Sequence, residues 1–170
     1  MCFFLLLSIL LVSSEGSECP RAYIDGGQGS CYFVSHDEVT WTEAMISCQI
    51  LEGYLVEIET QAEFDNIRSL LLNRTSQASV WVALSDKRQD KIWEWATSHT
   101  IYDPQAAEFD MWSPGEPDHY SKDGTEDCAL LDYFHGDGKS HDFQLADVQC
   151  SREELYVCEH KKLTQAVVVG

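Results

Sequence analysis

Apolar residues recur at helical spacing in the first half of the chain. In one stretch they lie three and four residues apart, at Trp41, Ala44, Met45, Cys48 and Leu51. This spacing predicts a helix with one buried face. Thr40 and Glu43 form the pattern of a capping box at its start, and Gly53 is suited to its C-terminal cap.

A second helix is predicted from the same signals further along. Thr60 and Glu63 repeat the capping-box pattern. The buried stripe of this helix consists of Phe64, Ile67 and Leu71.

Beyond residue 79 the pattern changes to short strands and long loops. Including one run before the first helix, we predict strands at 32–34, 80–84, 92–95, 129–131 and 155–157. The stretch from Thr97 to Asp127 is polar and rich in Pro, Gly and Asp, and so long a loop in a compact domain is usually functional. We expect core packing, rather than a stacking surface, for Trp81, Trp93, Trp95 and Trp112.

The start of the chain has the composition of a secretory signal peptide. An apolar run from Phe3 to Val12 is followed by small residues up to Gly16. The run is shorter than the ~20 residues of a membrane-spanning helix. We therefore predict a signal peptide at 1–16, one domain at 17–160, a tail at 161–170, and an extracellular, secreted protein without membrane insertion. In an exported chain the Asn-Arg-Thr sequon at Asn73 predicts a glycan.

The charge balance restricts the partners. Asp and Glu number 29 and Lys and Arg 11, which gives a net charge of −18. Such a surface repels nucleic acid and anionic membranes. It suits cations and uncharged or basic ligands.

The cysteines indicate a disulfide framework. Seven are present, and Cys2 falls in the signal peptide. The remaining six are Cys19, Cys31, Cys48, Cys128, Cys150 and Cys158. An even set in an exported chain predicts three disulfides, whose pairing the sequence leaves open. Cys19 and Cys31 flank a Gly-rich hairpin, which favours a local bridge between them, and no cysteine spacing suggests a zinc site.

Carboxylates are concentrated in three short motifs of the second half. The motifs are Gly115-Glu116-Pro117-Asp118, Glu126-Asp127-Cys128 and Asp147-Val148-Gln149-Cys150. Calcium is a hard cation that takes about six to eight oxygen ligands, so these motifs predict a calcium site.

The motifs and their order resemble those of the C-type lectin family. Their series includes Trp41-Thr42-Glu43-Ala44, Trp81-Val82-Ala83-Leu84, Trp93-Glu94-Trp95, the three acidic motifs and Tyr156-Val157-Cys158-Glu159. The resemblance covers Cys19 to Glu159 and implies a long-form C-type lectin fold of class α+β, with two helices, small antiparallel sheets and a long calcium-binding loop. It also implies disulfides Cys19–Cys31, Cys48–Cys158 and Cys128–Cys150. A short secreted chain of this kind is similar to soluble invertebrate lectins, including molluscan ones.

The resemblance implies one site for calcium and carbohydrate together. Carried over by position, its ligands are Glu116, Asp118, Glu126 and Asp147, with sugar hydroxyls completing the coordination of Ca²⁺. Pro117 matches the proline that follows a cis bond in the family, and X-Pro bonds adopt the cis form at low cost.

Two positions depart from the family pattern. Asp118 stands where mannose-type members have Asn, and Ala146 stands where the family has another Asn. Both amide donors to a sugar are therefore absent, because an ionised carboxylate and a methyl group donate no hydrogen bond. We expect calcium binding of modest affinity with altered or broad sugar selectivity. Replacement donors are available nearby in His119, Tyr120, Lys122, Lys139 and His141.

A second calcium site is a further expectation from the resemblance. Asp86, Asp90, Glu126 and Asp127 match positions that some members use for it. A position that is usually acidic carries His119. The alternative is that Asp86 and Asp90 are exposed loop residues without a ligand.

Three classes of function compete. We predict a calcium-dependent lectin that recognises microbial or host glycans, as in innate immunity, with a homodimer as one route to avidity. The alternative is a lectin-like module that binds protein or mineral without sugar, since one fold hosts many functions. We do not predict an enzyme, because no nucleophile–base arrangement or phosphate loop is evident.

Overall fold

The computed structural model describes residues 18–75, 78–104, 109–120, 125–133 and 143–162. The predicted signal peptide, the end of the tail, and Lys122, Lys139 and His141 lie outside these ranges. Across the described ranges, every helix is too short or too polar to cross a bilayer.

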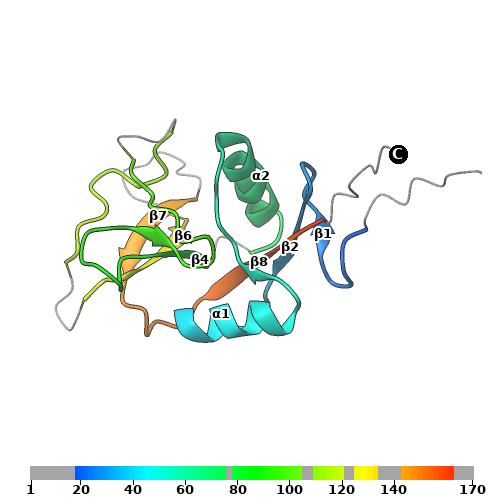
Figure 1. Ribbon diagram of the computed structural model, residues 1–170, viewed down its shortest axis with the longest axis horizontal. Coiled ribbons are helices and arrows are strands. Elements are labelled where there is room, and N and C mark those ends of the chain that lie inside the picture. The colour runs from blue at the N-terminus through cyan, green and yellow to red at the C-terminus, as the bar shows by residue number, and fades with distance from the viewer. Residues whose placement is uncertain (1–17, 76–77, 105–108, 121–124, 134–142, 163–170) are drawn as a thin grey trace, which may run out of the picture.

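The described residues form two helices and eight strands (Figure 1). The helices are α1 (Trp41–Ile50) and α2 (Gln61–Leu72). The strands are β1 (Ile24–Asp25), β2 (Ser30–Val34), β3 (Tyr54–Leu55), β4 (Val80–Ser85), β5 (Glu94–Trp95), β6 (Cys128–Asp132), β7 (Gln144–Val148) and β8 (Leu155–Lys161). The predicted α+β class is confirmed, whereas β1, β3 and β7 were not predicted.

The strands form one mixed sheet. Its main order is β1-β2-β8-β4-β6-β7, with β3 added beside β8 and β5 beside β4. All pairs are antiparallel except β4 and β8, which run parallel. In Figure 1, β2 and β8 lie between the two helices, and β4, β6 and β7 lie at the end of the sheet away from β1. The parallel pair joins these two halves, and it corrects the expectation of purely antiparallel sheets.

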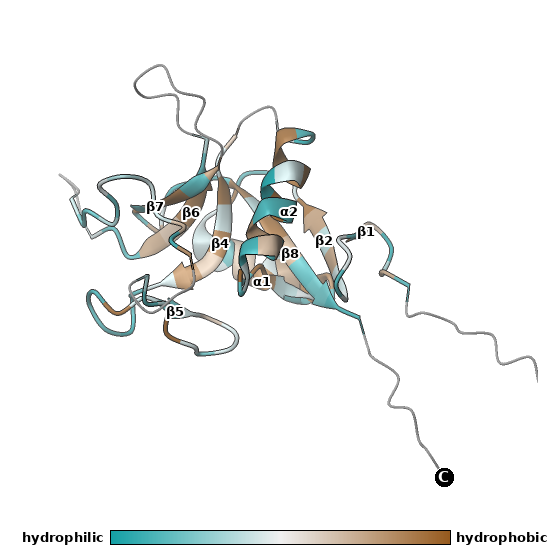
Figure 2. Ribbon diagram, turned by 90° about the horizontal axis from the view of Figure 1, so that it is seen from above, coloured by the Kyte–Doolittle hydropathy of each residue, from teal (hydrophilic) through white to brown (hydrophobic). Residues whose placement is uncertain are grey.

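The core runs along both halves of the sheet. Figure 2 shows apolar residues along β4, β6 and β8, and polar ones in the loops beside β7 and β5. The predicted packing of four tryptophans is confirmed, because Trp81, Trp93, Trp95 and Trp112 are all buried.

Helix α1 begins as predicted and ends differently. Thr40 and Glu43 form the complete capping box. At the other end the left-handed residue is Glu52, with φ of 63°, rather than Gly53, which the sequence pattern places at the C-terminal cap. The N–H of Gly53 donates to the carbonyl oxygen of Cys48 at 2.9 Å. Gly53 is required for a different reason: an added Cβ would lie 2.5 Å from the carbonyl oxygen of Glu159 in β8.

Helix α2 has only half of the predicted capping box. The N–H of Glu63 donates to the Thr60 hydroxyl at 3.2 Å. The Glu63 carboxylate turns inward instead of returning to Thr60: it accepts hydrogen bonds from the Tyr32 hydroxyl at 2.8 Å and the Glu59 N–H at 2.9 Å. The capping prediction for Glu63 was therefore wrong, because a tertiary contact with β2 competes for its side chain.

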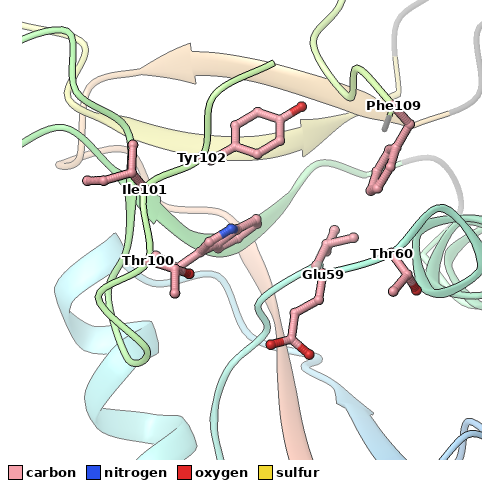
Figure 3. A pocket seen from close by; sticks show the side chains of 8 residues that line it. Glu59, Thr60, Thr100, Ile101, Tyr102 and Phe109 are labelled. Carbon is pink, nitrogen blue, oxygen red and sulfur yellow. The ribbon is translucent and has the colours of Figure 1, made fainter. Parts of the chain in front are cut away.

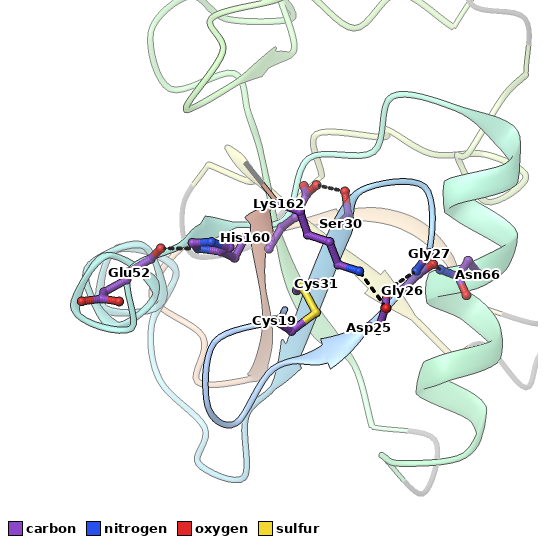
Figure 4. The surroundings of a disulfide bond; sticks show 11 residues. Cys19, Asp25, Gly26, Gly27, Ser30, Cys31, Glu52, Asn66, His160 and Lys162 are labelled. Carbon is purple, nitrogen blue, oxygen red and sulfur yellow. Dashed lines mark hydrogen bonds and ion pairs between the residues drawn. A yellow bond between two sulfur atoms is a disulfide. The ribbon is translucent and has the colours of Figure 1, made fainter. Parts of the chain in front are cut away.

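Three disulfides join the elements, with the pairing that the resemblance implies. They are Cys19–Cys31, Cys48–Cys158 and Cys128–Cys150. Figure 4 shows Cys19–Cys31 near the ion pair between Lys162 and Asp25, whose charged atoms are 2.7 Å apart. The first and last described segments are thus held together beside β1.

Candidate metal centre

Three carboxylates converge at the end of β7. Each of Glu116, Asp118 and Asp147 offers an oxygen within 4.8 Å of the others. We call these three residues the first carboxylate group. Glu116 and Asp118 are two positions apart in the sequence. Asp147 lies 29 residues beyond Asp118 and meets them because a loop folds back onto β7.

Strand β7 carries Asp147 and also anchors the loop. The N–H of Leu145 donates to the carbonyl oxygen of Met111 at 2.8 Å, and the N–H of Ser113 donates to that of Leu145 at 2.9 Å. A turn follows, in which the N–H of Glu116 donates to the carbonyl oxygen of Ser113 at 2.9 Å. The loop therefore starts from a fixed position beside β7.

Asp147 organises the backbone that follows Pro117. Its side chain is fully buried. Oδ1 accepts the Asp118 N–H at 3.0 Å, and Oδ2 accepts the His119 N–H at 2.8 Å. The Glu116–Pro117 peptide bond between the two other acidic residues is cis. Asp147 is thus both a candidate ligand and the residue that positions the loop.

The surroundings of Glu116 disfavour its charged form. Burial, a hydrogen bond with Asp147, and the charges of Asp147 and Asp118 raise its pKa from 4.5 to about 8. Like charges and desolvation both favour the neutral form of a carboxyl. Oε2 of Glu116 is buried and has no hydrogen-bond partner among the described residues. A cation bound here would reduce the repulsion between the carboxylates and would give Oε2 of Glu116 a partner.

Glu126 joins this group through Asp118. Its pKa is raised by burial, by the charges of Asp147 and Asp118, and by a hydrogen bond with Asp118, while Arg152 opposes the shift. Glu126 thus interacts with Asp118 and Asp147, but it is not among the three residues whose oxygens lie within 4.8 Å of one another. Ala146 packs against the hydrophobic core and offers no side-chain oxygen. Four carboxylates fit a hard oxygen-seeking cation such as Ca²⁺, with room in its coordination for water or ligand hydroxyls.

The predicted second site assembles differently. Asp86 and Asp90 gather with His119, each offering a ligand atom within 4.8 Å of the others. We call these three residues the second group. The Asp127 carboxylate accepts the Thr125 hydroxyl at 2.7 Å instead, and the backbone carbonyl of Asp127 accepts the Asp86 N–H at 3.2 Å.

Sequence reasoning missed two neighbours of the site. Trp93, predicted only as a core residue, also stacks on the His119 ring with centroids 6.0 Å apart. Arg152 lowers the pKa of Glu126. Its position just after Cys150 was the available signal, because Cys150 is bonded to the cysteine that follows Glu126-Asp127.

A cavity of about 320 Å³ lies elsewhere, between the start of α2 and a wall that Trp95, the segment 100–102 and Phe109 form (Figure 3). Its walls include Ile58, Trp95, Tyr102 and Phe109. None of its lining residues belongs to either acidic group. The chemistry of the acidic groups, rather than the size of this cavity, identifies the candidate site.

Known proteins share both sequence and fold with this chain. Residues 37–160 match the family described as Lectin C-type domain. Human C-type lectin domain family 10 member A is 36% identical over 150 residues, covering 86% of this chain and 42% of the human protein. Mouse lithostathine-1 is 30% identical over 173 residues, covering 94% of this chain and 96% of the mouse protein. The chain thus spans less than half of the first relative and nearly all of the second.

A solved structure extends the likeness to three dimensions. The C-type lectin domain of murine dendritic cell inhibitory receptor 2, in complex with an N-glycan, superimposes with a TM-score of 0.67 at 27% identity. The match covers 85% of this chain and 100% of that domain.

Proposed function

This chain belongs to the C-type lectin family, and we propose that it binds glycans through a calcium ion held by Glu116, Asp118, Glu126 and Asp147. The family comprises non-enzymatic binding proteins, so the chain is not an enzyme. The observation that carries the proposal is the convergence of Glu116, Asp118 and Asp147 with ligand oxygens within 4.8 Å of one another.

The charges of the site support calcium as the ion. Burial, together with the charges of the neighbouring carboxylates, raises the pKa values of Glu116 and Glu126 in the absence of a metal. Calcium accepts a flexible set of oxygen ligands, so coordination positions left by the protein are open to vicinal hydroxyls of a sugar. An uncharged glycan also suits a chain whose net charge is −18.

Sugar selectivity follows from the missing amides. Asp118 and Ala146 supply no donor to a sugar oxygen, and each lost hydrogen bond costs about 1 kcal/mol. Tyr120 is 69% exposed, and its N–H donates to Asp118 Oδ1 at 2.9 Å. Its ring and hydroxyl are therefore available beside the site. We propose a broad or altered selectivity rather than a strict mannose or galactose preference.

The setting of the protein is also part of the proposal. Its likeness to lithostathine-1 over nearly the full length of both chains supports a secreted, extracellular protein with one lectin domain. We propose microbial or host glycans as its ligands and a homodimer as the source of avidity. The expected likeness to soluble invertebrate lectins stays a prediction, as does the glycan at Asn73, whose side chain is exposed.

A glycan array with calcium and with chelator tests the proposal. We expect spots that require calcium. In a calorimetric titration, Glu116→Gln should lower the affinity for calcium at least about tenfold, which corresponds to ~1.4 kcal/mol. Asp65→Asn is the matched control, because Asp65 is an exposed carboxylate of α2 outside both acidic groups. If the wild type does not bind calcium at millimolar concentrations, the proposal is refuted.

The lectin-like module without sugar is the second candidate. Ala146, which offers no oxygen and packs on the core, favours it. This candidate predicts that the calorimetric titration shows calcium binding, but that no glycan on the array is bound in a calcium-dependent way.

A further inference from the structure

His119 belongs to the second group and also lies against Asp147 of the first carboxylate group. Its Nδ1 atom is 3.4 Å from Asp147 Oδ2 and 3.8 Å from Asp86 Oδ2. The side chains of those two aspartates are 0% and 1% exposed. One imidazole nitrogen therefore lies within ion-pair distance of two buried carboxylates that belong to different groups.

The ring is held in place by backbone and by aromatic packing. The N–H of His119 donates to the same Asp147 Oδ2 at 2.8 Å. The ring stacks on Trp93 at an interplanar angle of 19°. Trp93 in turn packs edge-on against Trp112, with centroids 4.8 Å apart. Because both tryptophans are buried, the core fixes the orientation of the ring.

Asp86 is fixed from its other side. Its Oδ2 accepts the Lys91 N–H at 2.8 Å, and its own N–H donates to the carbonyl oxygen of Asp127. Oδ1 of Asp86 is buried without a hydrogen-bond partner among the described residues. An additional carboxylate placed here would add a further negative charge, and it would therefore favour the binding of a cation.

The second group does not fit the calcium ion that the resemblance implies. Neither Glu126 nor Asp127 belongs to the second group. Glu126 interacts with Asp147 and Asp118 of the first group, and one oxygen of Asp127 accepts the Thr125 hydroxyl. Asp86 and Asp90 remain, far short of about six to eight oxygens. Imidazole nitrogen is a ligand for transition metals rather than for calcium.

We infer that this chain holds one calcium ion, and that His119 takes the place of a second ion by linking Asp86 to Asp147. The link positions Asp147, a ligand of the first site, without a metal. The inference rests on the proposed calcium site.

Calcium stoichiometry of the folded chain tests this inference. Equilibrium dialysis and calorimetry should give one ion for the wild type. His119→Asp should bind two, because it adds a third carboxylate beside Asp86 and Asp90. His119→Ala should bind one, because it removes the ring without adding a ligand. Terbium luminescence sensitised by Trp93 should gain a second component in His119→Asp alone, and circular dichroism checks that each variant is folded.

The outcomes separate the inference from the proposed function. Two calcium ions in the wild type would overturn the inference and leave the lectin site intact. No calcium in the wild type would overturn the first site itself. A folded His119→Asp protein that still binds one ion would refute the replacement role. Binding of Zn²⁺ by the wild type, lost in His119→Ala, would make the ring a metal ligand and also refute it.

Discussion

Single residues at the site carry more than one task. Asp147 accepts two backbone N–H groups from the loop and is also a candidate calcium ligand. One carboxylate oxygen of Glu116 has no hydrogen-bond partner among the described residues, and the pKa of Glu116 is raised. Both features are costs for the metal-free protein, and they are typical of positions selected for a ligand rather than for stability.

Calcium affinity should fall as the pH is lowered. The pKa of Glu116 is raised to about 8 and that of Glu126 is raised as well. Near neutral pH, Glu116 therefore holds a proton that calcium has to displace. Lower pH increases this competition, so calorimetric titrations from pH 8.5 to about 5.5 should show progressively weaker binding. A constant affinity over this range would contradict the prediction.

Glu116→Gln provides the control for that pH series. Glutamine has no proton to release, so the variant should show a shallower dependence near pH 8. The same raised pKa has an opposite signature in folding. Between 4.5 and about 8 the folded state retains a proton that the unfolded state has released, so the metal-free protein should lose stability as pH rises through that window.

At the scale of elements, close packing fixes how α1 meets the sheet. The helix ends with Glu52 in a left-handed conformation and Gly53 against β8. Cys48 in α1 is bonded to Cys158 in β8. Helix and strand therefore touch through a disulfide and through a backbone contact that tolerates no side chain.

Gly53→Ala should destabilise the protein by about 3 kcal/mol. Its Cβ would meet the Glu159 carbonyl oxygen at 2.5 Å, and overpacking of this kind costs about 1–3 kcal/mol. Gly27→Ala is the matched control, because Gly27 has φ of +72° and nothing within 4 Å of an added Cβ. That control should cost about 1 kcal/mol of left-handed strain. Urea denaturation of both variants measures the difference, and equal losses would refute the packing argument.

At the scale of the molecule, disulfides close loops of very different length. Cys48–Cys158 spans 110 residues and Cys19–Cys31 spans 12. The longer bridge joins α1 to β8, the last strand, and it restricts the unfolded chain more strongly. Chain entropy alone makes its contribution the larger by about 2 kcal/mol.

Removing each bridge by paired Cys→Ala changes tests this prediction. The variant without Cys48–Cys158 should unfold at lower denaturant than the variant without Cys19–Cys31. Cys48 and Cys158 are also fully buried, so cavity formation adds to the loss. A smaller loss for the longer bridge would show that native-state contacts, rather than loop length, decide its value.

Prediction from sequence succeeded where local chemistry decides. The capping box at Thr40 depends on residues three apart and is present. Glu63 has the same spacing from Thr60, but its carboxylate bonds to Tyr32 across the fold. Strand β7 was not predicted, because Asp147 interrupts its apolar pattern. Asp147 is buried by the loop whose backbone it positions.

The sequence by itself determined the family, the helix starts and the stock of acidic residues, because these depend on residue type and linear spacing. Only the tertiary structure decided which carboxylates meet. It directs Glu126 to Asp118 and Asp127 to Thr125, and it inserts His119 between Asp86 and Asp147. The contacts of Asp118 and His119 depend on how the 111–119 loop returns to β7, a geometry that spacing along the chain does not encode.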